Sequence, residues 1–87
     1  MPTYELRYGT GVEKALTHFP HDVQRRLLNR LGMLRTTPRP PGCIKLTDSD
    51  AYRIRVGDYR IIYLIHDDQL IVLVIDVGDR KNVYRRR

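Results

Sequence analysis

Apolar and polar side chains alternate at the start of the chain. In the stretch 3–8 (TYELRY), Tyr4, Leu6 and Tyr8 are separated by charged residues. A period of two residues is typical of a β-strand that buries one face. We therefore predict a strand over 3–8.

The pattern then changes to a helical period. The segment Thr10-Gly-Val-Glu13 has the Ser/Thr-x-x-Glu form of a capping box, which predicts that a helix begins there. The apolar residues that follow fall on one face of this helix: Val12, Ala15, Leu16 and Phe19.

A second helix follows directly. Pro20 ends the first helix and suits an early position in the next one, whose first turn contains Asp22. One stripe of this helix is apolar and consists of Val23, Leu27, Leu31 and Leu34. We predict a helical hairpin joined at the proline.

The rest of the chain is predicted to form a β-sheet. A loop over 36–42 holds three of the five prolines, and strands are expected over 51–56, from 59 to about 66 and over 69–77. Turns are expected at Gly57-Asp58 and Asp67-Asp68, and the third strand, apolar on both faces, should be central. The order predicts a single α+β domain over residues 1–87: an N-terminal strand, a two-helix hairpin, then an antiparallel sheet with both helices on one face.

Arginines interrupt these apolar strands. In AYRIRV, Tyr52, Ile54 and Val56 share one face, so Arg53 and Arg55 project from the other. Arg60 begins the next strand and should lie close to Arg55 across a tight hairpin, in a register that the sequence does not fix. Arg80 and Tyr84 follow the third strand. A single arginine on an open sheet face is ordinary, but several converging ones need carboxylates or an anion. Carboxylates could come from Asp58, Asp67 or Asp76.

Charge and composition narrow the class of partner. The 87 residues carry a net charge of +6, which favours polyanions such as nucleic acid or an acidic protein. The longest apolar run, Leu70–Ile75, is too short to span a membrane, and the N-terminus lacks a signal-peptide pattern. The single cysteine, Cys43, fits a reducing cytoplasm. The pair His18 and His21 lacks further ligands, so we expect no metal and no cofactor.

Taken together, YRIRVGDYRIIY and DVGDRKNVYRR resemble the RelE/ParE superfamily of toxins from bacterial and archaeal toxin–antitoxin pairs, over nearly the whole chain. The resemblance implies the RelE-like microbial RNase fold. In the RelE branch it implies an endoribonuclease that cleaves mRNA in the ribosomal A site by attack of the ribose 2′-hydroxyl on the adjacent phosphate. The catalytic set would be Arg53, Arg55, Arg60, Arg80 and Tyr84, and the RNA-binding set Lys45, Lys81, Arg85 and Arg86.

The resemblance also implies partners: a cognate RelB-like antitoxin, the ribosome with its mRNA, and operator DNA only through the toxin–antitoxin complex. One departure concerns Arg53 and Arg55, since relatives often carry lysines there. Lysine can act as a base, whereas arginine effectively cannot. Two alternatives stay open: a ParE-like inhibitor of DNA gyrase, and a catalytically inactive module that binds antitoxin and acts as co-repressor.

Overall fold

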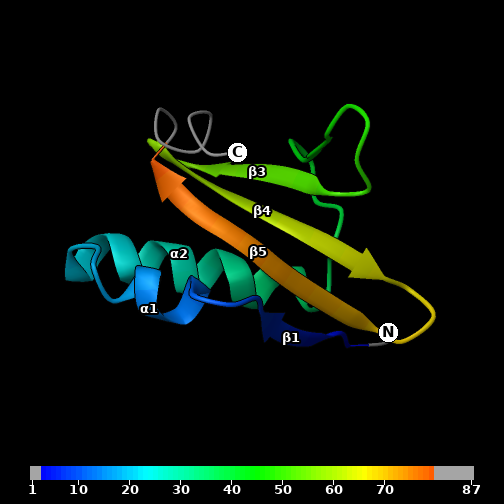
Figure 1. The fold of residues 1–87 in the computed structure, drawn as a ribbon, viewed down its shortest axis with the longest axis horizontal. Helices are drawn as coiled ribbons and strands as arrows, with labels where there is room; N and C mark the ends of the chain where they lie inside the picture. Colours follow the sequence, from blue (N-terminus) through cyan, green and yellow to red (C-terminus); the bar gives the residue numbers. More distant parts are fainter. Residues whose placement is uncertain (1–2, 80–87) are drawn as a thin grey trace.

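The computed structural model describes residues 3–79 of the 87-residue chain, as seven helices and strands. In chain order they are β1 (Glu5–Tyr8), α1 (Val12–Leu16), α2 (His21–Leu34), β2 (Ile44–Lys45), β3 (Tyr52–Val56), β4 (Tyr59–His66) and β5 (Ile71–Asp79) (Figure 1). Every strand and helix predicted within 3–79 is present. The two-residue strand β2 is not predicted by the sequence pattern.

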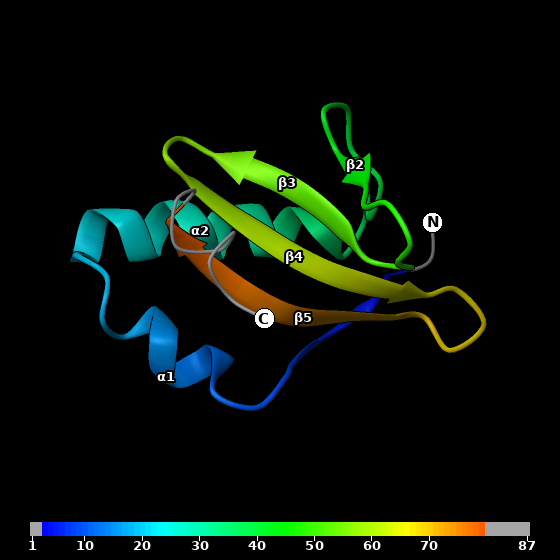
Figure 2. The same cartoon turned by 45° about the horizontal axis from the view of Figure 1, so that its top comes forward.

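The strands form one sheet in the order β1-β5-β4-β3-β2. β3, β4 and β5 make the expected antiparallel meander, and β5 lies between β4 and β1, as its two apolar faces predict. β1 pairs with β5 in parallel. The sheet is therefore mixed, because α1 and α2 carry the chain back before the meander begins (Figure 2).

The start of α1 differs from the prediction. Gly11, at a φ of 83°, occupies the N-cap position, and no side chain makes a capping hydrogen bond there. The capping box predicted at Thr10 is therefore wrong, and α1 begins at Val12 and ends at Leu16, before Phe19. Backbone bonds replace the cap, since the N–H of Val12 donates to the carbonyl of Gly9 at 3.2 Å. Pro20 is the N-cap residue of α2.

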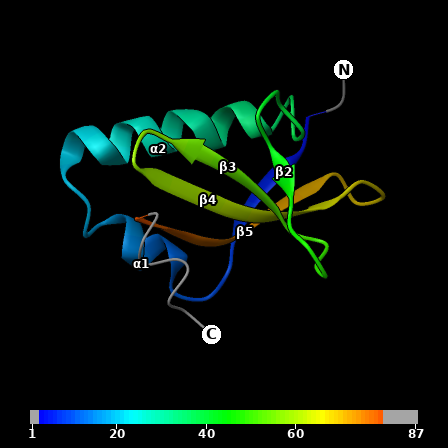
Figure 3. The same ribbon diagram turned by 90° about the horizontal axis from the view of Figure 1, so that it is seen from above.

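One hydrophobic core joins the helices to the sheet. Its buried residues are Val12, Leu16, Val23, Leu27, Leu31, Leu34, Ile54, Ile61, Tyr63, Val72, Val74 and Val77. The strand members all face the same side, because each is a direct cross-strand partner of another or lies two positions from one. Figure 3 shows α2 running along one side of the strands. The predicted α+β class, with helices packed on one sheet face, is confirmed.

A polar network fixes the end of the sheet where β4 leads into β5. Arg39 donates two hydrogen bonds to Asp67, at 2.8 Å and 3.3 Å, and Tyr4 Oη donates another at 2.6 Å. Arg39 Nε also donates to Tyr52 Oη at 3.2 Å. The hydrogen bonds from Arg39 and then Tyr4 lower the pKa of Asp67 to about 2. The network ties β1, the proline-containing loop, β3 and the β4–β5 loop together.

Replacing Asp67 with asparagine should lower the free energy of unfolding in a pH-dependent way. The folded-state pKa lies below the usual 3.8, so the carboxylate stabilises the fold above about pH 4 and loses this effect as the pH falls towards about 2. Urea unfolding should therefore separate the variant from wild type at about pH 6 more than at about pH 2.5. Asp68→Asn, at an exposed loop position, is the control, and an equal difference at both pH values would contradict the prediction.

Candidate nucleic-acid interface

The sheet face opposite the helices carries two rows of side chains near the β3–β4 turn. In the first row Arg55 pairs with Arg60, and Arg60 pairs with Gly78 on β5. Directly opposed residues in an antiparallel pair have Cα atoms about 5 Å apart, so two guanidinium groups start from adjacent positions. Gly78 adds no side chain beside Arg60.

The second row lies one step further from the turn. Ile44 of β2 pairs with Arg53, Arg53 with Ile62, and Ile62 with Asp76. Arg53 is two residues from Arg55 on the same strand, and therefore on the same face about 7 Å away. The two rows together bring Arg53, Arg55 and Arg60 to one surface, which we call the arginine face.

The three arginines differ in exposure. Arg55 is exposed, whereas Arg53 retains 9% of its accessible surface and Arg60 only 1%. This differs from the expectation of guanidinium groups standing side by side in solvent. Nε of Arg53 is buried and has no hydrogen-bond acceptor among residues 3–79. A buried donor without an acceptor costs about 1–3 kcal/mol, so this face suits an added acceptor such as a phosphate oxygen.

The turn between β3 and β4 sets this arrangement. Its two loop residues are Gly57, at a φ of 62°, and Asp58, and Val56 pairs with Tyr59 across it. Glycine at the first loop position is what a type II′ hairpin turn requires. Because side chains alternate with a period of two, a slip of one residue on β3 would turn Arg53 and Arg55 towards the helices.

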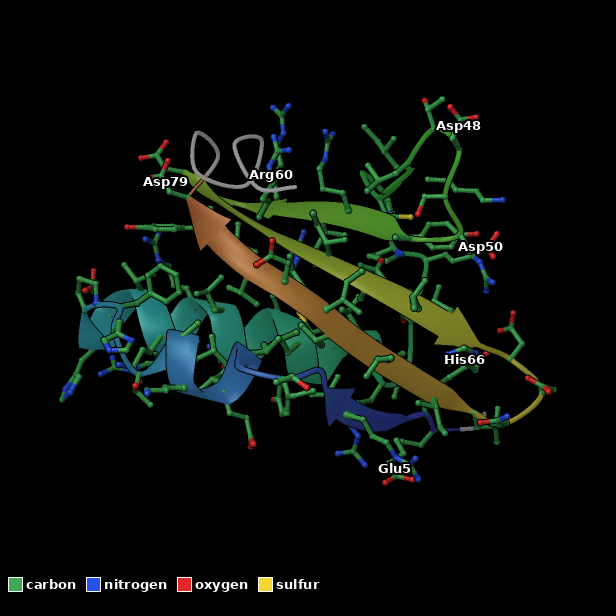
Figure 4. All side chains as sticks on the ribbon, viewed as in Figure 1. Glu5, Asp48, Asp50, Arg60, His66 and Asp79 are labelled. Atoms are coloured by element: carbon green, nitrogen blue, oxygen red, sulfur yellow. The ribbon has the colours of Figure 1, made fainter. Side chains whose placement is uncertain are left out.

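The three aspartates that could neutralise these arginines lie in different parts of the structure. Asp67 accepts hydrogen bonds from Arg39 at the far end of the sheet. Asp58 is exposed in the β3–β4 turn, and Asp76 is half-buried on the arginine face. Figure 4 shows Arg60 and Asp79 towards one end of β4 and β5, and His66 towards the other. Arg60, Asp76 and Asp79 each take part in polar or electrostatic contacts of their own. Asp76 is thus the carboxylate that the register places beside these arginines.

One further predicted site residue, Lys45, belongs to the described part of the chain and lies away from this face. Lys45 pairs with Tyr52 and so lies on the helix side of β2. Its contact with RNA stays a prediction. The remaining candidates lie outside the described residues: Arg80, Lys81, Tyr84, Arg85 and Arg86.

Residues 3–79 show neither a metal-binding cluster nor a membrane-spanning helix. No group of three or more histidine, cysteine, aspartate or glutamate side chains is arranged there to hold a metal ion. None of the helices in this part of the chain has the length and apolar character needed to cross a bilayer.

Known proteins resemble this chain in sequence and in fold. Residues 6–84 match the family model described as the ParE toxin of type II toxin–antitoxin systems, parDE. No curated protein sequence matched the chain significantly.

Solved structures give closer geometric comparisons. RelE in the archaeal RelE–RelB complex from Pyrococcus horikoshii is 30% identical, with a TM-score of 0.77 over 90% of this chain and 96% of that one. The isolated RelE toxin of E. coli is 29% identical, with a TM-score of 0.77 over 94% and 92%. RelE in the intact E. coli RelBE complex is 26% identical, with a TM-score of 0.77 over 87% and 95%.

The family model covers almost the whole chain, and the RelE structures match it at nearly full length in both directions. The resemblance read from the sequence is thereby confirmed. The chain belongs to the RelE/ParE superfamily of toxins from type II toxin–antitoxin systems.

Proposed function

We propose that this toxin is a ribosome-dependent endoribonuclease that cleaves mRNA in the ribosomal A site and so inhibits translation in the cytoplasm. The observation that carries the proposal is the arginine face, on which Arg53, Arg55 and Arg60 occupy adjacent positions opposite the core. Likeness to RelE structures over nearly the whole chain supports the same branch.

The chemistry follows from what guanidinium groups do to phosphates. Their planar donors bind phosphate oxygens in pairs, and such contacts stabilise the negative charge that develops when a 2′-hydroxyl attacks the phosphate. Arg55 is exposed and can meet the RNA backbone directly. Arg60 is 1% exposed, so contact with it requires the surrounding groups to rearrange. Arg80 and Tyr84 would complete the site as the resemblance implies.

A RelB-like antitoxin is the protein partner we propose. RelE is found with RelB in the structures from P. horikoshii and E. coli. An antitoxin that places carboxylates over Arg53 and Arg55 would neutralise the charge that RNA needs. Operator DNA would then be bound only by the toxin–antitoxin complex.

The direct test is incubation of the purified protein with ribosomes programmed with a defined mRNA, followed by mapping of the new RNA ends. We expect cleavage within the codon in the A site, and none of the same mRNA free in solution. Intact mRNA at every codon tested would contradict the proposal.

The second candidate function is inhibition of DNA gyrase. It is favoured by one observation, the match of residues 6–84 to the ParE toxin model. A supercoiling assay separates the two: gyrase inhibition with intact ribosome-bound mRNA supports this candidate, and uninhibited supercoiling with cleaved mRNA supports the first.

A further inference from the structure

Resting on the proposed ribonuclease function, we propose that Asp76 is the general base that takes the proton from the attacking 2′-hydroxyl group. The three arginines of the arginine face cannot fill this role, because an arginine side chain in a protein is effectively never deprotonated. The reaction therefore needs a proton acceptor elsewhere on the same face.

The position of Asp76 follows from the strand register. Asp76 is the cross-strand partner of Ile62, and Ile62 is the partner of Arg53. Arg60 pairs with Gly78, two residues beyond Asp76. Such diagonal neighbours have Cα atoms about 7–8 Å apart, within reach of a long side chain. A phosphate bound by Arg60 would thus lie next to the carboxylate of Asp76.

A β-bulge puts the carboxylate on this face. Ile62 pairs with Asp76 but Tyr63 pairs with Val74, so Ile75 is an extra residue on β5. Without it, the register set by Tyr63 and Val74 would place Asp76 opposite Ile61, on the buried side against the helices. The bulge directs Asp76 to the arginine face and lets Val77 enter the core instead. Bulges often re-aim a side chain beside an active site.

Two other proton acceptors on this face within residues 3–79, His66 and Glu5, lie too far from Arg60. His66 is six residues from Arg60 along β4, about 20 Å at the usual rise of a strand. Glu5 is bonded to Arg7 on β1, at the same distant end of the sheet. Asp76 is half-buried, so part of its side chain is accessible to solvent.

The cleavage reaction needs no reactant other than water. The 2′ oxygen forms a bond to phosphorus while its proton passes to the Asp76 carboxylate. The bond from phosphorus to the 5′ oxygen breaks, and that oxygen takes a proton from water. The products are a 2′,3′-cyclic phosphate and a free 5′-hydroxyl, and Asp76 returns its proton to solvent.

The test is single-turnover cleavage of ribosome-bound mRNA with the toxin in excess. Asp76→Asn should cleave about 100-fold more slowly, with unchanged ribosome binding. Asp58→Asn makes the same charge change in the nearby turn and should stay within about threefold of wild type.

Asp76→Glu is a second variant that keeps the negative charge but displaces the carboxylate, so it separates a catalytic role of Asp76 from a role in folding or charge balance. A general base should then lose about tenfold in rate, whereas a charge that merely balances the arginines should lose nothing. A wild-type rate in Asp76→Glu, or an Asp76→Asn protein that cleaves normally or fails only in binding, would overturn the role of Asp76 and leave the proposed function standing. An inactive wild-type protein would instead overturn the ribonuclease function itself.

Discussion

Replacing Arg60 with alanine should slow cleavage of ribosome-bound mRNA by about 10²–10³-fold, the usual effect of removing one preorganised donor that stabilises transition-state charge. Arg60 is the middle member of its row, between Arg55 and Gly78, and its side chain is held in place by burial. Once the surrounding groups have moved aside to admit the RNA, a guanidinium held in this way loses little further conformational freedom when the transition state forms. The measurement is the single-turnover rate at saturating toxin.

Arg60→Lys shows which property of the side chain matters. Lysine keeps the charge but lacks the planar pair of donors, so it should recover only a small part of the lost rate. Arg25→Ala removes one positive charge from the exposed surface of α2 and serves as the matched control. Thermal unfolding of each variant separates lost chemistry from lost fold. Cleavage by a folded Arg60→Ala protein at the wild-type rate would refute the role of Arg60.

Local patterns in the sequence predicted much of this structure. The apolar stripe of α2 is buried at all four positions, and alternation on β3 separates Ile54, in the core, from Arg55, in solvent. Both predictions rest on a repeat of a few residues that lies within a single helix or strand. The two-residue turn that contains glycine likewise predicted that Arg60 lies close to Arg55, but it is the structure that shows them as direct cross-strand partners.

Features that join distant parts of the chain were not predictable in this way. Tyr4 and Asp67 are 63 residues apart and meet only because β1 adds to the sheet beside β5. No short-range pattern in the sequence predicts the pairing of β1 with β5. The predicted capping box failed for a related reason, since the backbone near Gly9 is held by β5 and shapes the entry into α1.

The bulge at Ile75 is the most consequential of these features for the site. The segment QLIVLVIDV is apolar at most positions, so its alternation does not say which residues face the helices. Sequence alone offered Asp76 as one of three possible neutralising carboxylates. Only the register, with its one extra residue, places Asp76 on the arginine face and Asp67 at the other end of the sheet.

Replacing Leu27 with alanine should lower the free energy of unfolding by about 3 kcal/mol, as expected for a fully buried leucine whose removal leaves a cavity. Small domains are stable by only about 5–15 kcal/mol, so the variant would lose a large share of its total. Urea unfolding at neutral pH measures the change. Leu28→Ala is the matched control: it makes the same substitution one position along α2, where the side chain is 48% exposed, and should cost less than about 1 kcal/mol.

The consequence for the site follows from the two faces of β3 and β4. Leu27 shares a core with Ile54 and Ile61, and these residues alternate along their strands with the arginines of the other face. Loosening the core should therefore reduce cleavage by lowering the folded fraction, most clearly near the unfolding temperature, while the rate per folded molecule stays close to wild type. Equal losses of stability in Leu27→Ala and Leu28→Ala would show that α2 does not pack against the sheet by its Leu27 face, and the arrangement that puts the arginines on the opposite face of the sheet would be wrong.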